Sequence, residues 1–289
     1  MKIAVLMGGI SSEREISLMS GGAILQGLLN LGHDAFKIVL GEENYLTALM
    51  EHEYDLAYIA LHGEFGEDGR VQAVLDILKK PYTGSGVTAS AVSMDKILTK
   101  IIVDDFGIKT PMKYTSIEQI KNYPIVIKPS KEGSSVGLYI CQNLVEAEKA
   151  IEKLKGIDLV IEEFISGLEL TAGILNGEKL GVVKIIPNSG TYDFESKYTV
   201  GKTIYEVPAK IEENYYEEAM EIASKVHNIL NLRGMSRSDF ILSEDGLYFL
   251  EVNTSPGMTT TSLLPKLGEL KGYNFETILE KTVSEAMNI

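Results

Sequence analysis

A predicted β-hairpin in the last fifth of the chain constrains the fold most. Residues 237–242 and 247–253 are apolar at nearly every second position, and the segment Ser-Glu-Asp-Gly joins them. This pattern is typical of two antiparallel strands and a tight turn. A three-residue loop that ends in a left-handed Gly246 would place Asp239 directly opposite Glu251. The hairpin is therefore predicted to bring two carboxylates face to face.

Two carboxylates opposed on neighbouring strands repel each other, so this pairing calls for a positive charge nearby. Because side chains two apart on a strand share a face, Phe249, Glu251 and Asn253 are expected on one side. The oxygens of Asp239, Glu251 and Asn253 are hard ligands that suit Mg²⁺. The alternative is an exposed hairpin whose acids point into water. The small hydroxyl residues and breakers of 254–259 favour the metal site, since they are suited to bringing backbone N–H groups close to an anion.

Charge and length limit the partners and the organisation of the chain. Lys plus Arg total 27 against 41 for Asp plus Glu, a net charge of −14, which argues against nucleic acid or an anionic membrane as a partner. A chain of 289 residues is too long for one ordinary core, so two or three subdomains are expected. The single cysteine, Cys141, leaves no internal disulfide. With no signal peptide and no apolar segment of membrane-spanning length, a cytoplasmic protein is expected.

The amino-terminal third is predicted to be a doubly wound α/β domain with a parallel sheet. Residues 3–7 form an apolar run that ends in a glycine pair, and Ser12 and Glu15 match a capping box at the start of a helix. Glu13 would ordinarily compensate the helix dipole, and a lone histidine such as His62 is more often structural than functional. Both residues follow predicted strands, however, and ligands of open α/β sheets bind at the carboxyl ends of strands. A structural and a functional interpretation of each therefore stay open.

The middle of the chain contains a segment suited to binding phosphates. Residues 130–137 are rich in glycine and serine and join two short predicted strands. A flexible hairpin tip could have this composition, but free backbone N–H groups, hydroxyls and flanking lysines also suit wrapping a polyphosphate. The strand predicted over 159–165 contains Glu162 and Glu163, and Glu169 follows shortly after. Such acids are usually solvated, but in a crevice they could accept hydrogen bonds from an adenine amino group and ribose hydroxyls.

Together these stretches resemble the D-alanine–D-alanine ligases of the ATP-grasp superfamily. The resemblance covers nearly the whole chain through G-G-I-S-S-E-R-E-I-S-L, A-L-H-G-E-F-G-E-D-G, S-M-D-K, K-P-S-K-E-G-S-S-V-G, Y-D-F-E-S-K-Y and N-T-S-P-G-M-T. It implies an α/β (α+β) ATP-grasp architecture in three parts. These are an N-terminal doubly wound parallel-sheet domain (1–86), a central ATP-binding subdomain with the glycine loop (87–167), and a C-terminal subdomain with the metal hairpin and a long loop (168–289).

The resemblance also implies a reaction. ATP would phosphorylate the carboxylate of one D-alanine, and the amine of a second would attack the acyl phosphate, giving the dipeptide for peptidoglycan precursor synthesis. A homodimer is expected by the same analogy. Two alternatives stay open: another ATP-grasp carboxylate–amine ligase, or a nucleotide-binding regulator that no longer catalyses. The second is disfavoured because Arg237, Glu251 and Asn253 are all present.

Roles for single residues follow from the same resemblance. Two Mg²⁺ ions, with Mn²⁺ as an alternative, would be held by Asp239, Glu251 and Asn253. The residues expected around the phosphates, adenine and ribose of ATP are Lys96, Lys128, Ser134, Glu162, Glu163, Ile165, Glu169 and Lys197. Those expected around the two D-alanines and the acyl phosphate are Glu13, His62, Arg237, Gly257, Ser262 and Leu263. Glu13, Ser134 and Tyr198 match a hydrogen-bonded trio that closes a lid, and Tyr198 favours an amine over a hydroxyl nucleophile.

Overall fold

The computed structural model describes residues 1–188, 199, 201–259 and 262–288. Two predicted site residues, Lys197 and Tyr198, lie outside the described residues. Among the described helices, none has both the length and the apolar character needed to cross a membrane.

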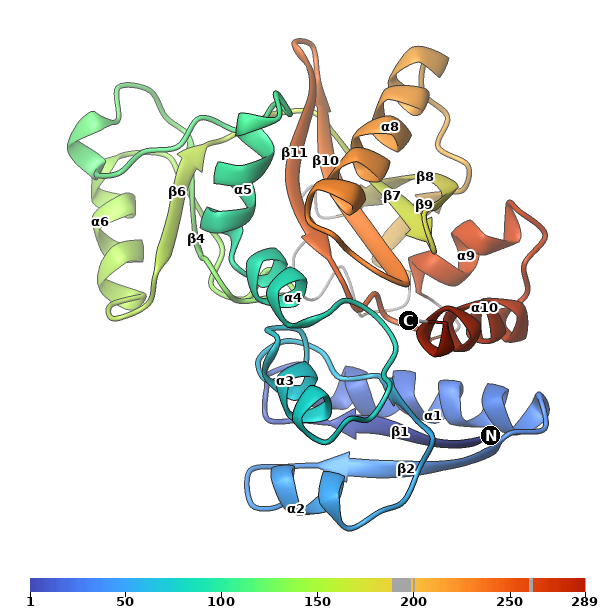
Figure 1. The fold of residues 1–289 in the computed structure, drawn as a ribbon. Coiled ribbons are helices and arrows are strands. Elements are labelled where there is room, and N and C mark those ends of the chain that lie inside the picture. The colour runs from blue at the N-terminus through green and yellow to red at the C-terminus, as the bar shows by residue number, and fades with distance from the viewer. Residues whose placement is uncertain (189–198, 200, 260–261, 289) are drawn as a thin grey trace.

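The chain begins with a parallel sheet, as predicted, and its three strands have the order β2-β1-β3 (Figure 1). Its elements in chain order are β1 (Lys2–Gly8), α1 (Arg14–Asn30), β2 (Asp34–Leu40), α2 (Tyr45–Met50), β3 (Leu56–Ile59) and α3 (Arg70–Ile77). Strand β1 is apolar after the exposed Lys2 because both faces of the rest of the strand are buried. Ile3 and Val5 pack with Ile24 on the α1 side, whereas Ala4 and Leu6 pack in a separate core with residues of α2 and α3.

The predicted capping box at the start of α1 is wrong. Glu13, not Ser12, is the N-cap residue, and no side chain caps the helix. Ser11 explains the difference, because its hydroxyl accepts a hydrogen bond from the Glu13 N–H at 3.2 Å and donates to the His62 carbonyl at 2.7 Å. Ser11 thus fixes the start of α1 to the chain that follows β3. This contact holds Glu13 and His62 at the same edge of the sheet.

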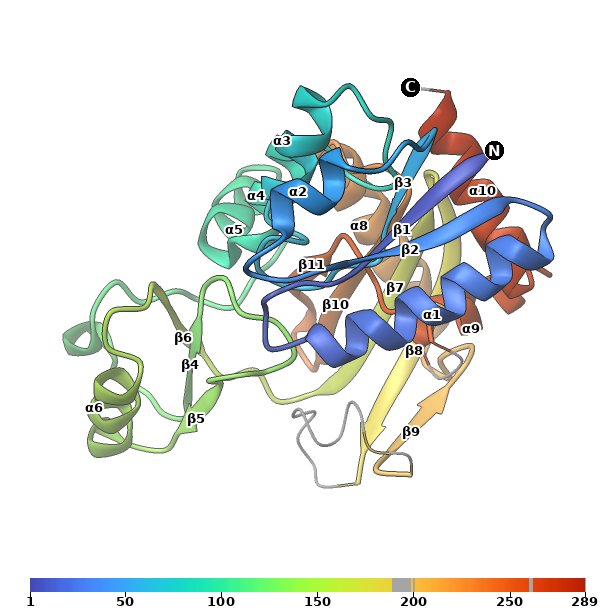
Figure 2. The same cartoon turned by 90° about the horizontal axis from the view of Figure 1, so that it is seen from below.

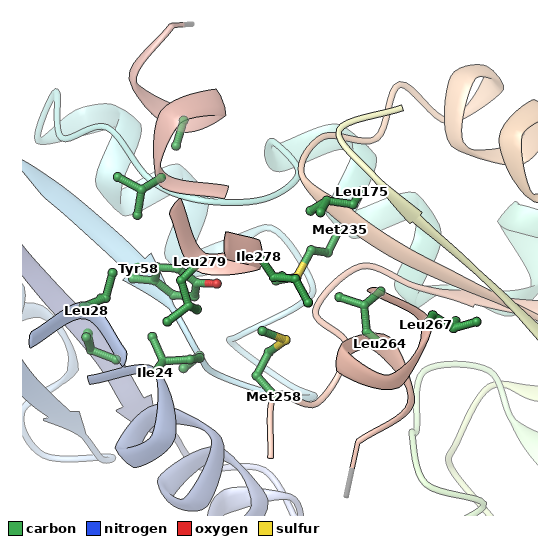
Figure 3. Packing of buried hydrophobic residues seen from close by; sticks show 14 of the residues in the cluster. Ile24, Leu28, Tyr58, Leu175, Met235, Met258, Leu264, Leu267, Ile278 and Leu279 are labelled. Carbon is green, nitrogen blue, oxygen red and sulfur yellow. The ribbon is translucent and has the colours of Figure 1, made fainter. Parts of the chain in front are cut away.

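The carboxyl-terminal helices pack against the amino-terminal sheet. Helices α9 (Leu263–Glu269) and α10 (Phe275–Met287) share one core with α1 and β3, and Figure 3 shows Leu279 beside Ile24, Leu28 and Tyr58. Gly27 permits this close approach, since a Cβ there would lie 2.5 Å from Leu279 Cδ1. The first and last parts of the chain therefore do not have separate cores. The three predicted domain limits remain a prediction.

The central unit is the predicted β-β-α-β unit with an antiparallel sheet of order β5-β4-β6 (Figure 1). Its elements are η1 (Ile117–Gln119), β4 (Ile125–Pro129), β5 (Tyr139–Cys141), α6 (Leu144–Lys153) and β6 (Leu159–Glu163). Cys141 is buried in its core with Ile125 and Ile127. The unit extends away from the parallel sheet in both views (Figures 1 and 2).

The helix predicted over 87–106 is two helices. They are α4 (Val87–Met94) and α5 (Lys96–Asp105), separated by an extended Asp95. The Asp95 side chain accepts hydrogen bonds from the backbone N–H groups of Ile97 and Leu98, so it caps α5 as aspartate commonly does. This break turns α5 toward the central unit, while Val103 of α5 packs in the core of the largest sheet.

The largest sheet is antiparallel, of order β11-β10-β7-β8-β9. Its strands are β7 (Leu168–Leu175), β8 (Glu178–Pro187), β9 (Thr203–Glu206), β10 (Met235–Ser243) and β11 (Gly246–Asn253). Helix α8 (Glu213–Ile229) covers one face of the sheet, and the β10–β11 hairpin lies between α5 and α8 in Figure 1. Strand β9 had no clear sequence signal, because its four residues follow a long polar segment.

The hairpin has the predicted pairing of Asp239 with Glu251, but a different turn produces it. Ser243 pairs with Gly246, so the loop has two residues, and the register shifts by one at a bulge between Asp239 and Phe240. Without the bulge, the two-residue turn would pair Asp239 with Leu250. The bulge also changes which side chains of β11 point to the same face of the sheet. Phe249 is buried in the core, whereas Leu250 and Glu251 both line a cavity, so the expectation that Phe249 shares a face with Glu251 is wrong.

Candidate active site

A cavity of ≈ 530 Å³ is lined by segments from every part of the chain. Its lining begins at the start of α1 and includes the loop after β3, the start of α5, the glycine loop, β11 and the segment before α9. Ten predicted site residues line it: Glu13, His62, Lys96, Ser134, Arg237, Glu251, Asn253, Gly257, Ser262 and Leu263. The fold thus brings together residues that are up to 250 positions apart in the sequence, from Glu13 to Leu263.

A second cavity, of ≈ 380 Å³, lies along the sheet of the central unit. Five predicted nucleotide residues line it, namely Lys128, Glu162, Glu163, Ile165 and Glu169. Its other lining side chains include the apolar Val126, Ile140, Phe164, Ile241 and Leu250. An apolar slot with a few polar groups at its edge suits a flat heteroaromatic base. The Glu163 carboxylate accepts a hydrogen bond from the Met112 N–H at 2.8 Å.

A smaller cavity of ≈ 110 Å³ connects the other two. Lys96 and Glu251 line both this cavity and the large one, while Lys128 and Glu169 line both this cavity and the apolar slot. Asp239 lines the connecting cavity and neither of the other two. The carboxylates of Asp239 and Glu251 therefore lie at the junction between the slot and the large cavity, and Asn253 lines the large cavity together with Glu251.

The charges around the hairpin acids are balanced by cations of the chain itself. Arg237 donates two hydrogen bonds to the Asp239 carboxylate, from Nε at 3.1 Å and from Nη2 at 3.2 Å. Lys96 Nζ lies 3.5 Å from Glu251 Oε2. The repulsion between the two acids therefore does not by itself demand a metal ion. Thr171 Oγ1 adds a neutral hydrogen bond to Asp239 at 2.5 Å.

The donor atoms at the junction nevertheless fit Mg²⁺. The described residues contain no cluster of three or more His, Cys, Asp or Glu side chains that could hold a metal, so this site offers two carboxylates and the Asn253 amide. Mg²⁺ usually takes one or two carboxylates and fills the rest of its octahedron with waters and phosphate oxygens. Asn253 Oδ1 also accepts the Ser255 N–H at 2.9 Å, which orients the amide.

Glu13 and the glycine loop meet at one end of the large cavity. The Ser134 hydroxyl donates a hydrogen bond to Glu13 Oε1, so two members of the predicted trio are in contact. Ser134 and Ser135 both have positive φ, 52° and 59°. A Cβ on Gly133 would lie 2.7 Å from Glu13 Oε2, so only glycine lets the loop come this close to the carboxylate.

His62 and Glu67 form the buried wall behind Glu13. His62 Nε2 lies 3.3 Å from Ser20 Oγ, and burial lowers the pKa of the imidazole, so a neutral ring is favoured. Glu67 accepts the N–H groups of Gly63 at 2.7 Å and Ser255 at 3.2 Å. Burial and the neighbouring Glu13 raise the pKa of Glu67 to about 8. The sequence showed three acids in this loop, but no pattern separated Glu67 from the other two.

The last predicted substrate residues line the same cavity from the segment before α9. Ser262 is the N-cap residue of α9, and its Oγ accepts the Thr259 N–H at 2.9 Å. A Cβ on Gly257 would lie 3.0 Å from Ser262 Oγ, so the backbone of this segment lies close to the serine. Leu263 follows as a buried residue at the cavity wall.

Comparison with known proteins identifies the family. The family model for the D-ala D-ala ligase C-terminus matches residues 83–284, and that for the N-terminus matches residues 43–85. A D-alanine–D-alanine ligase of Fusobacterium nucleatum subsp. nucleatum is 56% identical over 284 residues, covering 98% of each chain.

Solved structures agree with this relationship. The D-alanine–D-alanine ligase from Bacillus anthracis, complexed with ATP, has a TM-score of 0.86 at 30% identity and covers 100% of this chain and 98% of its own. The VanG D-Ala:D-Ser ligase from Enterococcus faecalis has a TM-score of 0.85 at 29% identity and covers 99% of both chains. The predicted ATP-grasp architecture is confirmed, and the chain belongs to the D-alanine–D-alanine ligase family.

Proposed function

We propose that this protein joins two D-alanines into D-alanyl-D-alanine with ATP and Mg²⁺, releasing ADP and phosphate. The observation that carries the proposal is the continuous series of three cavities. An apolar slot for a base leads through a junction of lysines and acids into a larger polar cavity. This order places a nucleotide's phosphates between its base and the bound amino acids, which is the arrangement that carboxylate phosphorylation requires.

Charge neutralisation is the main task of the residues at the junction. A carboxylate anion repels ATP and is a poor electrophile, so catalysis depends on cations placed where negative charge develops. Bound Mg²⁺, held by Asp239, Glu251 and Asn253, would supply much of that neutralisation at the β- and γ-phosphates. Lys96 of α5 and Lys128 of β4 add positive charge, since both line the connecting cavity.

The large cavity would bind and orient the two amino acids. Glu13 is the candidate partner for the ammonium of the first D-alanine, with His62 nearby. Arg237 and the backbone of Gly257 are the candidate groups for the acyl phosphate and the tetrahedral oxyanion. Ser262 and Leu263 would hold the carboxylate of the second D-alanine. All six residues line the same cavity.

The cellular setting belongs to the same proposal. D-alanyl-D-alanine made in the cytoplasm would enter peptidoglycan precursor synthesis, and a homodimer is expected from the family resemblance. Light scattering from the purified protein tests the homodimer, which would have twice the 31.7 kDa mass of one chain.

The proposed reaction predicts release of phosphate and formation of the dipeptide when purified protein is incubated with ATP, Mg²⁺ and D-alanine. L-alanine is the matched control, and D-alanine with D-serine tests the second subsite, because one structural relative is a D-Ala:D-Ser ligase. Turnover with another carboxylate and amine pair but not with D-alanine would indicate a different ligase of the superfamily. Binding of ATP without turnover on a wide substrate panel would indicate a regulator.

A further inference from the structure

Lys100 is a fully buried lysine that the proposed chemistry does not use. Helix α5 buries Lys96, Thr99, Lys100 and Val103, so two lysines occupy positions that an amphipathic helix normally fills with apolar residues. The apolar Leu98 and Ile101 of the same helix are 46% and 56% exposed. An ammonium group is costly to bury without partners. Burying Lys100 therefore costs desolvation free energy, which interactions with its partners must offset.

Lys100 shares one carboxylate with Lys128. Lys100 Nζ binds Oε2 of Glu162, and Lys128 Nζ lies 2.8 Å from Oε1 of the same side chain. The Lys100 side chain is 0% exposed, whereas Lys128 and Glu162 are 9% and 3% exposed. Both of these partners line the apolar slot. Lys100 thus contacts Glu162 on the side away from the slot and cannot contact a ligand itself.

The three groups carry a net charge of +1, because two cations face one anion. Burial and then the neighbouring Lys128 lower the pKa of Lys100 to about 8. Burial would also lower the pKa of Lys128, but the charges of Glu162 and Glu251 outweigh it, and that pKa is raised. Burial would raise the pKa of Glu162, but the two lysines outweigh it, and that pKa is lowered. The carboxylate is therefore ionised, and Lys128 holds its proton most firmly.

We propose that Lys100 is a positioning residue that neutralises Glu162 from behind and so leaves the charge of Lys128 available to a nucleotide's phosphates. With Lys100 absent, Glu162 and Lys128 would form a closed one-to-one pair with no net charge. With Lys100 present, Glu162 Oε1 keeps Lys128 in place without cancelling its charge. This inference rests on the proposed use of ATP.

A double-variant series with two ligands tests the proposal. The dissociation constants of ADP with Mg²⁺, and of adenosine, which has no phosphates, are measured calorimetrically for wild type, Lys100→Met and Lys100→Met/Glu162→Gln. Lys100→Met is expected to weaken ADP binding about tenfold, equivalent to about 1.4 kcal/mol, and to leave adenosine binding unchanged. The double variant restores a net charge of +1 at Lys128, and the amide that replaces the Glu162 carboxylate retains an acceptor oxygen. Because Glu162 also lines the apolar slot, the replacement can change adenine binding, which ADP and adenosine share. The ratio of the ADP to the adenosine dissociation constant is therefore expected to return close to the wild-type value.

A matched control separates this role from a structural one. Lys113 also holds α5, through an ion pair with the partly exposed Asp104, so Lys113→Met removes a lysine contact to α5. The backbone bridge of Lys113 to Glu162 and the two ion pairs of the Glu162 carboxylate are kept. Lys113→Met is expected to leave ADP binding unchanged. Two results would overturn the proposal. One is equal weakening of ADP and adenosine binding by Lys100→Met, and the other is a higher ratio of the ADP to the adenosine dissociation constant for the double variant than for Lys100→Met.

The remaining outcomes are also decisive. If Lys100→Met does not fold, the double variant decides. A near wild-type ratio of the ADP to the adenosine dissociation constant supports the proposal, and a clearly higher ratio overturns it. If wild-type protein and Lys100→Met bind ADP equally well, this inference alone is overturned. Wild-type protein that binds no ADP overturns the proposed function together with it.

Discussion

Replacing Glu251 by Gln is expected to lower kcat roughly 10²–10³-fold, the usual effect of removing one electrostatic contact to a transition state. The substitution keeps the size of the side chain and removes the negative charge. Asp239, which Arg237 already engages with two hydrogen bonds, would then be the only carboxylate among the three candidate metal ligands. The measurement is phosphate release at saturating ATP and D-alanine over a range of Mg²⁺ concentrations.

The matched control for this variant lies at the tip of the same hairpin. Glu244 is exposed in the turn, so Glu244→Gln makes the same chemical change away from the cavities and should keep wild-type kcat. Glu251 is itself 31% exposed, and the thermal midpoint of Glu251→Gln should therefore stay near that of wild type. A kcat close to wild type for Glu251→Gln would remove Glu251 from the proposed metal site.

Replacing Arg237 by Met is expected to lower kcat by a similar factor, roughly 10²–10³-fold, if its guanidinium stabilises the oxyanion. Arg237 lines the large cavity and is held in a fixed orientation by Asp239. Methionine fills much of the same volume without the charge or the donors. Single-turnover and steady-state rates of phosphate release would measure the loss.

A charge-retaining variant separates two roles of Arg237. Arg237→Lys keeps the positive charge but loses the two-pronged guanidinium, so an intermediate rate is expected if geometry matters as well as charge. ADP binding with Mg²⁺ should change little in Arg237→Met if the residue acts on the reacting carboxylate. A variant that binds ADP poorly but turns over normally at saturation would instead assign Arg237 to the nucleotide.

The hairpin shows how sequence reasoning reached the correct contact by an incorrect route. The alternation of apolar residues predicted both strands, and an assumed three-residue loop placed Asp239 opposite Glu251. The structure has a shorter loop and a bulge that compensates for it. No sequence signal marks a bulge at Leu250, because residues 247–250 form a continuous apolar run in which no position stands out. The side on which Phe249 lies was therefore predicted incorrectly.

Long-range packing is the part of the fold that could not be predicted from the sequence. No sequence pattern indicated that α10 packs on α1 through Gly27. Lys100 shows the same limit, since a lysine on a predicted helix is normally assigned to the solvated face. Its buried partner Glu162 lies 62 positions away. Single motifs predicted the residues of the site, whereas the partners of those residues required the fold.

A crystal structure with ADP, Mg²⁺ and a phosphinate analogue of the dipeptide tests the central claim most directly, namely that the hairpin acids form the metal site at the junction of the cavities. We expect Mg²⁺ coordinated by Asp239, Glu251 and Asn253 at distances of about 2.1 Å, with the phosphates between the apolar slot and the large cavity. Nucleotide bound elsewhere, or bound at the junction with these three side chains in contact only with Arg237, Lys96 and solvent, would contradict it.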